Sequence, residues 1–486
     1  MIKHILLSIL LTATLSAFAQ SDAELVKATI SQSTIKGHVY FLASDELKGR
    51  ATGSPEIGIA AKYLSTTFQR YGVQPVPGAV DGYFQPMILE TVTPATTKKV
   101  SAGEKLFEDI VVLGGGNMTE SLETVFVEYG TEKDYKKKDV KGKLVIALAG
   151  SKDASDLSGA FATSESKSQL AKYKGAAGII ELTSFTEAEW TRLNRYYGRS
   201  STKIKSNDTD NFLHLMVKSD EAGLSALKSN KSADIQIEGS TSTDMPAKNV
   251  VGMVEGTDPQ LKNEFVIYSA HYDHIGIGKP NAEGDSIYNG ARDNAVGVVT
   301  VMSAAENIAR NPTKRSALFI LFTGEEKGLL GSRYYAENPL IPMNQMVYCF
   351  NSDNGGYNDT SIATIVGLGR TTAADHIMKA CETFDLKAID DPAGEQGLFD
   401  RSDNVNFAAQ GVPAPTFSLG FTAFDAEITK YYHQTADNPE TLDYDYLYKF
   451  FGAYVLACRL IANDPTTPFW TEGDKYYEAG KALYEK

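Results

Sequence analysis

From Ala247 to the C-terminus, short apolar runs alternate with helix-like segments, and this alternation most constrains the fold. Buried strands are expected at 264–269, 317–322 and 346–351, and helices at 297–309 and 329–337. Strands that alternate with helices build a largely parallel sheet with helices on both faces. The sequence therefore predicts an α/β domain with a mixed, largely parallel sheet.

The part of the chain before Ala247 shows two kinds of sequence pattern. Residues 30–47 and 57–71 carry apolar side chains at helical spacing, whereas 106–245 contains short β-like runs separated by glycine-rich and polar turns. We expect residues 20–105 to form the first part of the α/β domain, 106–245 to form an inserted β-rich domain, and 246–486 to complete the α/β domain.

Residues 1–19 have the pattern of a secretory signal peptide. Lys3 and His4 precede a short apolar core, and Ala17-Phe18-Ala19 fits the small residues before a cleavage site. The apolar core is too short for a typical membrane span, and no later window is long and apolar enough to form one. We therefore expect an exported chain, periplasmic or secreted, without a membrane span in its mature form.

Charge and cysteine content exclude several classes of protein. The chain has 486 residues, with 47 Lys and Arg against 61 Asp and Glu, and a net charge of −14. Nucleic-acid-binding proteins usually carry a basic face, so no nucleic-acid partner is expected. The cysteines, Cys349, Cys381 and Cys458, have no CxxC spacing and cannot form a disulfide framework. The oligomeric state is left open.

Three of the expected strands end in side chains that bind metal ions. His271 and Asp273 follow the first strand, Glu325 and Glu326 the second, and Asp353 the third. Ligands of open α/β sheets bind at the carboxyl ends of the strands, so these residues should meet at one edge of the sheet.

Two further segments add donors of the same kind, because Asp293 leads into a helix and His433 lies late in the chain. Imidazole and carboxylate ligands without thiolate suit Zn²⁺, with Mn²⁺ or Co²⁺ as alternatives. Two cations that share one carboxylate need about five protein ligands and one spare carboxylate as a base, and the sequence offers that number. Each segment alone has a common explanation without a metal ion; for example, a Glu pair often begins a helix. Their joint occurrence in one domain indicates a metal centre.

Four runs of the sequence match a known family. They are Ser-Ala-His-Tyr-Asp at 269–273, Gly-Ala-Arg-Asp-Asn-Ala-Val-Gly at 290–297, Phe-Thr-Gly-Glu-Glu-Lys-Gly-Leu-Leu-Gly-Ser at 322–332, and Tyr-His at 432–433. Together they resemble the co-catalytic di-zinc exopeptidases, the family that includes bacterial leucyl aminopeptidase, the Streptomyces-type aminopeptidase and glutamate carboxypeptidase II.

The resemblance implies a ligand set, position by position. Asp293 would bridge two Zn²⁺ ions. His271 and Asp353 would also hold one ion, and Glu326 and His433 would also hold the other.

The resemblance also implies roles around the ions. Glu325 would be the general base, and Tyr432 would steady the tetrahedral intermediate. Asp273 would hold the His271 ring by its other nitrogen. Arg401 would line the substrate site.

The match to known sequences is weaker in two places. Asn404 stands where the family usually has His, in a position that is not a metal ligand. Residues 106–245 resemble a protease-associated (PA) domain, through Val-Lys-Gly-Lys-Leu-Val at 140–145 and Gly-Ala-Ala-Gly-Ile-Ile at 175–180.

The implied activity is that of a zinc-dependent aminopeptidase, which removes N-terminal residues from peptides with a free N-terminus through a metal-activated water. A carboxypeptidase or dipeptidase on the same scaffold is an alternative, with Arg292 and Arg401 as candidates for a carboxylate pocket. A glutaminyl cyclase with one zinc ion is another. A non-catalytic, receptor-like binding module is a third, although such a protein should have lost some of the ligands.

Overall fold

The computed structural model describes residues 20–206 and 212–485. The predicted signal peptide, residues 1–19, lies outside the described residues. The chain divides into two compact units, one made of Met1–Pro86 with Ala247–Lys486 and the other of Met87–Pro246.

The first unit is built on a mixed sheet. In spatial order its strands are β18 (Lys387–Asp390), β17 (Ile362–Val366), β19 (Thr416–Leu419), β16 (Met346–Ser352), β12 (Phe265–His271), β15 (Ser316–Phe322), β11 (Thr241–Val254) and β1 (Phe84–Thr93). The neighbours β19, β16, β12 and β15 are parallel, whereas β11 is antiparallel to β15 and β17 is antiparallel to β19. The predicted strands correspond to β12, β15 and β16, and the predicted α/β fold is confirmed.

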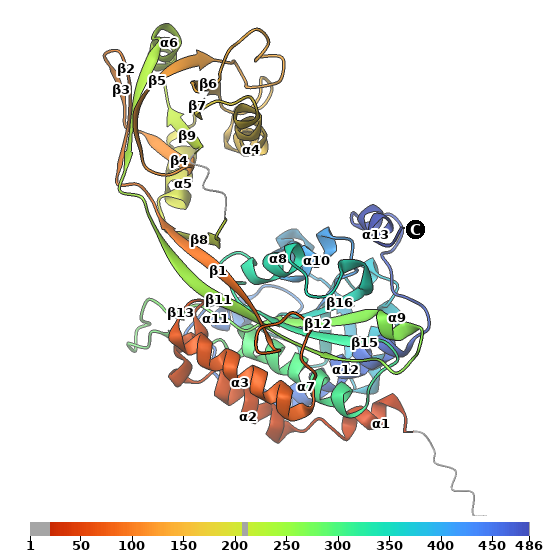
Figure 1. Ribbon diagram of the computed structural model, residues 1–486. Coiled ribbons are helices and arrows are strands. Elements are labelled where there is room, and N and C mark those ends of the chain that lie inside the picture. Colours follow the sequence, from red (N-terminus) through yellow and green to blue (C-terminus); the bar gives the residue numbers. More distant parts are fainter. Residues whose placement is uncertain (1–19, 207–211, 486) are drawn as a thin grey trace, which may run out of the picture. The chain divides into compact units, whose positions relative to one another are not determined.

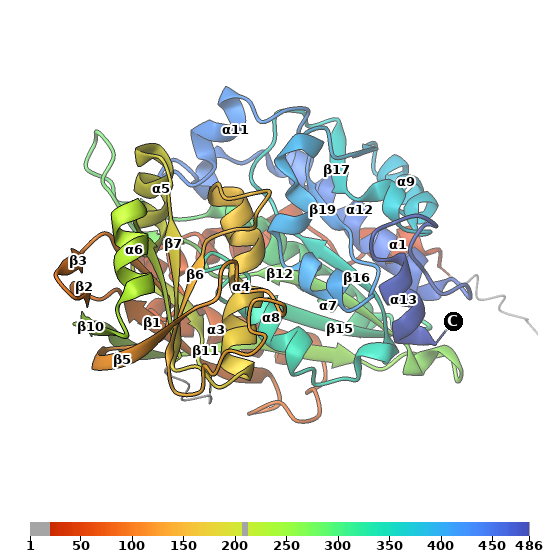
Figure 2. The same ribbon diagram turned by 90° about the horizontal axis from the view of Figure 1, so that it is seen from above.

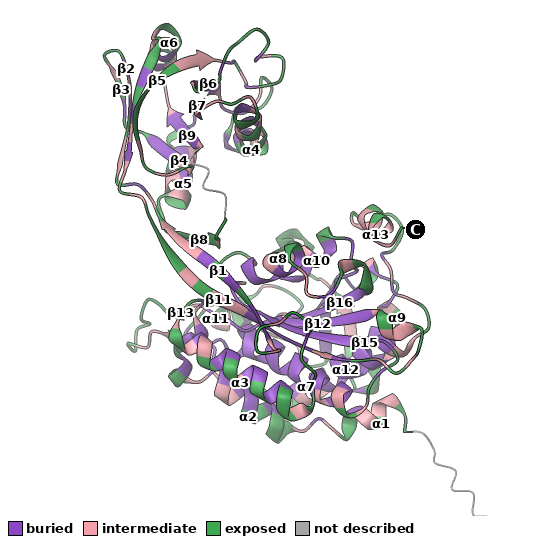
Figure 3. Cartoon of the chain, viewed as in Figure 1, coloured by how far each residue is buried: buried purple, intermediate pink, exposed green. Residues whose placement is uncertain are grey.

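The central strands are buried on both faces, as expected for parallel strands covered by helices. Side chains alternate between the faces along each strand. Val266, Tyr268 and Ala270 of β12 enter one hydrophobic cluster, and Phe265 and Ile267 enter the other. Figure 3 shows these strands as the buried centre of the unit.

Helices cover both faces of this sheet (Figure 1). The first cluster receives side chains from α1 (Asp22–Lys27), α2 (Gln32–Leu42), α3 (Pro55–Tyr71), α7 (Gly297–Arg310), α9 (Ala374–Thr383) and α12 (Tyr444–Asn463). The second cluster receives side chains from α8 (Leu330–Glu337), α10 (Asn404–Ala409) and α13 (Tyr477–Tyr484). The short helix α11 (Ala426–Tyr431) and the small hairpin of β13 (Gly276–Ile277) and β14 (Ile287–Tyr288) complete the unit.

The second unit has its own sheet and its own helices (Figure 2). The strand order is β3 (Lys105–Phe107), β2 (Thr97–Ala102), β10 (Ser232–Glu238), β5 (Met118–Phe126), β6 (Leu144–Leu148), β7 (Gly178–Thr183), β9 (Leu213–Lys218) and β4 (Ile110–Gly114). The helices are α4 (Leu157–Tyr173), α5 (Glu187–Tyr197) and α6 (Glu221–Ser229), and β8 (Ser201–Ile204) pairs with residues 89–92 of β1.

The division between the units differs from the predicted boundary at residue 106. Residues 97–107 form β2 and β3, and β2 pairs with β10 inside the second unit. This segment belongs to the second unit because its strands complete that sheet. Its short, polar strands gave no sequence signal for this pairing.

Candidate metal centre

The predicted donors lie at one edge of the first unit's sheet. His271 is the last residue of β12, and Asp353 directly follows β16. Glu325 and Glu326 lie in the loop after β15, and Asp293 lies in the turn Ala291–Val296 that leads into α7. These strands are parallel, so their carboxyl ends bring residues far apart in the sequence together.

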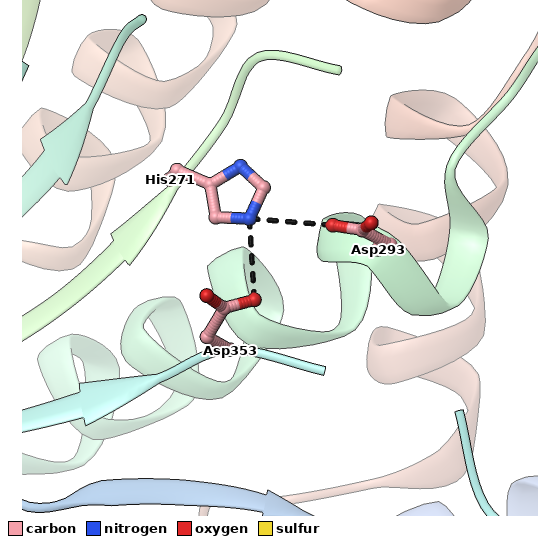
Figure 4. Close-up of side chains that lie close together, drawn as sticks. All are labelled: His271, Asp293 and Asp353. Carbon is pink, nitrogen blue, oxygen red and sulfur yellow. Dashed lines mark hydrogen bonds and ion pairs between the residues drawn. The ribbon is translucent and has the colours of Figure 1, made fainter. Parts of the chain in front are cut away.

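One group of donors surrounds the imidazole of His271 (Figure 4). Its Nε2 lies 3.3 Å from Asp293 Oδ1 and 3.3 Å from Asp353 Oδ1. The ring is buried, and Asp353 is partly open to a cavity. We call these three residues the first donor group.

A second group forms on the other carboxylate oxygen of Asp293. His433 Nε2 lies 3.1 Å from Asp293 Oδ2 and 3.6 Å from Glu326 Oε2. His433 follows α11 with a φ of 56°, in the left-handed region that residues other than Gly rarely adopt. We call Asp293, Glu326 and His433 the second donor group, and Asp293 belongs to both groups.

These distances fit divalent metal ions. Two atoms bound tetrahedrally to one Zn²⁺ at about 2.0–2.2 Å lie about 3.3–3.5 Å apart. The separations in the first group are 3.3 Å, and those in the second are 3.1 and 3.6 Å. His271, Asp293 and Asp353 form one of the clusters in which the donor atoms lie within 4.8 Å of one another. The residues present therefore fit two cations bridged by Asp293.

The Asp273 carboxylate binds the backbone of the loop that carries Glu325 and Glu326. Its Oδ1 accepts a hydrogen bond from the backbone N–H of Glu325 at 3.2 Å, and its Oδ2 accepts one from that of Glu326 at 3.4 Å. Thr52 Oγ1 donates to the same Oδ2 at 2.7 Å. The His271 ring is held differently from the prediction, because His271 Nδ1 pairs with the main-chain carbonyl of Asp273 at 3.1 Å and lies 3.8 Å from its carboxylate. The carboxylate is turned toward three other donors.

The turn that presents Asp293 is fixed by Asp437. The carboxylate of Asp437 accepts hydrogen bonds from the backbone N–H groups of Arg292, at 2.9 and 3.0 Å, and of Asp293, at 3.1 Å. It also pairs with the Arg292 guanidinium at 3.1 Å, and that guanidinium stacks on the Tyr431 ring. Arg292 is therefore a buried part of this turn and does not line the cavity.

The surroundings of Glu325 and Asp293 shift the pKa values of these two residues in opposite directions. Burial raises the pKa of Glu325 well above its usual value, and the nearby Asp353 and Asp403 carboxylates raise it further, although His271 opposes them. Burial also favours a raised pKa for Asp293, but His274, His271 and His433 outweigh it and hold that pKa below its usual range. The raised pKa of Glu325 suits a group that accepts protons, whereas the lowered pKa of Asp293 favours the charged form that could hold a cation.

A cavity opens over both donor groups. His271, Glu325, Glu326 and His433 line its polar side. Its apolar side is lined by Val366, Leu398, Phe421, Phe424 and Ile428. Tyr432 also lines the cavity, with its ring stacked on that of His433 at a centroid distance of 4.1 Å.

Arg401, Ser402 and Asn404, which lie close together in the sequence, have different surroundings in the structure. Arg401 lines the cavity and is exposed. Ser402 Oγ donates to Asp353 Oδ2 at 2.5 Å and so steadies a donor of the first group. Asn404 is buried and donates to the main-chain oxygens of Phe399 and Ala414, a packing role away from the donors.

Sequence reasoning did not assign three residues that the structure places here. His274 is buried against Glu326, Ser402 contacts Asp353, and Asp437 holds the turn of Asp293. His274 and Asp437 are polar residues close in sequence to the ligands His271 and His433. Their closeness in sequence to these ligands was the signal that could have identified them as part of the site.

The comparisons with known proteins agree with this site. The model of peptidase family M28 matches residues 249–456. Aminopeptidase YwaD of Bacillus subtilis is 24% identical over 218 residues, which is 44% of this chain and 44% of that protein. The probable leucine aminopeptidase 2 of Aspergillus oryzae is 22% identical over 430 residues, which is 80% of this chain and 76% of that protein.

A solved structure shares the fold of this chain. The aminopeptidase from Aneurinibacillus sp. strain AM-1 superposes with a TM-score of 0.52 at 20% sequence identity, over 92% of this chain and 97% of that one. Within residues 20–206 and 212–485, no helix has the length and apolar character needed to span a membrane. The segment that matches the model of peptidase family M28, residues 249–456, carries all the donors described above.

Proposed function

We propose that the chain is an exported zinc-dependent aminopeptidase that removes N-terminal residues from peptides. The observation that carries the proposal is the pair of donor groups that share Asp293 beside Glu325, at the polar side of one cavity. The relatives named as aminopeptidases support the reaction class. The signal-like residues 1–19 support export.

The donor groups would hold two Zn²⁺ ions, the first through His271, Asp293 and Asp353, and the second through Asp293, Glu326 and His433. When bound, such ions polarise a carbonyl group and lower the pKa of water to about 7. Mn²⁺ or Co²⁺ would suit the same imidazole and carboxylate donors.

Glu325 would take a proton from the attacking water and pass it to the leaving amine. Its raised pKa suits this role, because a carboxylate with a higher pKa accepts a proton more readily. Tyr432 lines the same cavity, and its hydroxyl would donate a hydrogen bond to the oxyanion. Asp273 would act indirectly, by holding the backbone N–H groups of Glu325 and Glu326.

The cavity favours an apolar side chain at the substrate N-terminus. Phe421 and Ile428 are almost fully buried, and together with Val366, Leu398 and Phe424 they present apolar surface next to the donors. We expect leucine- and phenylalanine-type residues to be removed faster than charged ones. A matched apolar pocket discriminates by about 1–3 kcal/mol per methylene.

The carboxypeptidase or dipeptidase alternative now depends on Arg401 alone. Arg292 is committed to Asp437 and Tyr431, whereas Arg401 lies on the cavity wall. A substrate carboxylate could pair with that guanidinium.

We further propose that residues 87–246 are the PA-like inserted domain.

A peptide mixture tests the proposal. Each peptide is supplied with a free and with an acetylated N-terminus, and the products are read by mass spectrometry. The proposal expects sequential loss of N-terminal residues from the free peptides only, and no loss with Glu325→Gln. Trimming from the C-terminus, abolished by Arg401→Gln, would favour the alternative instead.

A further inference from the structure

His274 is a buried imidazole beside the second donor group. It is fully buried, and among residues 20–206 and 212–485 neither ring nitrogen has a hydrogen-bond partner. Its Nδ1 lies 2.7 Å from Glu326 Oε1 and 3.9 Å from Asp293 Oδ2. Glu326 Oε1 likewise has no hydrogen-bond partner in the described part of the chain. Two buried polar atoms that face each other without a hydrogen bond need another explanation, because leaving such atoms unsatisfied costs about 1–3 kcal/mol each.

The backbone makes room for this ring. Gly290 has a φ of 61°, and a Cβ there would lie 2.5 Å from His274 Cδ2 and 2.2 Å from the carbonyl oxygen of Asp293. Any side chain at position 290 would displace the imidazole from the donors. The glycine before the turn of Asp293 therefore allows His274 to reach them.

We propose that His274 is a protein ligand of the second metal ion, through Nδ1, together with Asp293, Glu326 and His433. This inference rests on the proposed function. His274, Asp293 and Glu326 form a cluster whose donor atoms lie within 4.8 Å of one another. The His274 and His433 ring centroids lie 5.8 Å apart, within the range of about 5–6 Å for two rings that bind one ion at 2.0–2.1 Å.

The added ligand makes the two sites unequal. The first donor group supplies three protein ligands, the number typical of catalytic zinc sites with an open position. The second would supply four, the number typical of closed sites. The second site should therefore fill first and release its ion last, and the first site should exchange its ion more readily.

Metal binding to the purified chain tests this directly. The metal-free protein is loaded with one equivalent of Zn²⁺, and X-ray absorption counts the imidazoles around the ion. The proposal expects two imidazoles, from His274 and His433. A single imidazole would overturn it, whether the ion sits in the first site or His274 only orients Glu326. This measurement needs no variant.

A variant adds an affinity readout. His274→Leu should weaken the tighter Zn²⁺ site by more than about 100-fold, because even partners outside the ligand shell cost about 10–100-fold, and should leave the weaker site unchanged. His38→Leu is the matched control, since it removes another buried imidazole, one that pairs with Tyr63 and Tyr71. Equal affinities in His274→Leu and the wild type would overturn the assignment. A wild-type chain that binds fewer than two ions, or leaves free peptides uncut, would instead count against the proposed function.

Discussion

Asp273 accepts a hydrogen bond from the backbone N–H of Glu325, with 3.2 Å between Asp273 Oδ1 and the nitrogen. The neighbouring N–H of Glu326 and the Thr52 hydroxyl share the other oxygen. A single buried carboxylate thereby fixes the loop that carries both the proposed base and a donor of the second group. Burial raises the pKa of Asp273 above its usual value, and the Glu326 carboxylate adds to this, although His271 and the hydrogen bonds from Thr52 and the Glu325 N–H oppose them.

Asp273→Asn should slow turnover and leave the ligands themselves in place. An amide has only one acceptor oxygen, so at least one of the three donors loses its partner, at a cost of about 1–3 kcal/mol in the free energy of unfolding. We expect kcat to fall by about 10- to 100-fold through misplacement of Glu325, with KM little changed. Steady-state kinetics and thermal unfolding measure the two effects. Wild-type kcat in a destabilised variant would show that Asp273 serves stability alone.

Glu325→Gln should abolish acid–base help while keeping the shape of the site. General acid–base catalysis contributes about 10²–10⁴-fold, and we expect kcat to fall by at least that factor. The metal content should stay as in the wild type, because Glu325 belongs to neither donor group. Elemental analysis and kinetics are run together, with Glu337→Gln at the exposed end of α8 as a matched control. Near-wild-type turnover would remove Glu325 from the role of base.

Asp293→Asn should reduce metal binding at both sites at once. Each carboxylate oxygen of Asp293 faces a different imidazole, Oδ1 toward His271 and Oδ2 toward His433. The amide nitrogen of Asn cannot bind a cation, so one group loses its bridging donor and the other loses its anionic charge. Metal stoichiometry after dialysis measures the loss, and two ions retained per chain would contradict the bridge.

Much of this site could be predicted because several of its donor residues lie at or just after the ends of predicted strands. His271, Glu326 and Asp353 come directly after apolar runs that the structure shows as β12, β15 and β16. Parallel strands place their carboxyl ends at one edge, so residues far apart in sequence converge without any knowledge of packing. Asp293 and His433 were also candidate donors by residue type, but their roles as ligands came from the resemblance, because the loops that carry them have no periodic signal.

The parts that could not be predicted depend on tertiary packing. The apolar side of the cavity combines Val366 of β17, Leu398 of a short helical turn before α10, Phe421 and Phe424 of the loop after β19, and Ile428 of α11. These residues share no periodic sequence pattern. The partner of the His271 ring is a main-chain oxygen, which carries no side-chain signal. Residues 97–105 were expected in the first unit but belong to the second, because strand pairing over a long sequence separation decides where they belong.

The second unit contains a buried charge network that should govern its stability. Glu181 is fully buried and pairs with Lys167 Nζ at 2.9 Å and with His214 Nε2 at 2.9 Å, and Ser164 donates to it as well. Burial alone would raise its pKa, but His214, Lys167 and Ser164 lower it below its usual value. Glu181→Gln would leave the Lys167 ammonium buried without a counter-ion.

We expect Glu181→Gln to lower the free energy of unfolding by about 3–5 kcal/mol, as for other buried pairs that lose one partner. Asp244→Asn is the matched control, because it removes the counter-ion of the exposed Lys205 and should cost less than about 1 kcal/mol. Replacing both partners, as in Lys167→Met with Glu181→Leu, should recover much of the loss. Chemical unfolding followed by Trp190 fluorescence reports on this unit. Equal effects of the buried and the exposed substitutions would refute the argument.

The last prediction concerns pH and comes from His38 on α2. Its ring is buried between the hydroxyls of Tyr63 and Tyr71, at 2.6 and 2.7 Å, and can donate to one and accept from the other only while neutral. Burial, helped by Arg70, lowers its pKa from 6.5 to about 4. The unfolded chain therefore binds a proton that the folded chain does not between these pH values.

Stability should consequently fall as the pH drops from 6.5 toward 4, with a slope from His38 of up to about 1.4 kcal/mol per pH unit. His38→Gln does not titrate, so its free energy of unfolding should depend less on pH across this window. Denaturant unfolding of the metal-free wild type and variant at several pH values measures the difference in slope, and using metal-free protein avoids protons released by ligand binding. Parallel curves for the two proteins would show that the folded chain does not lower the pKa of His38.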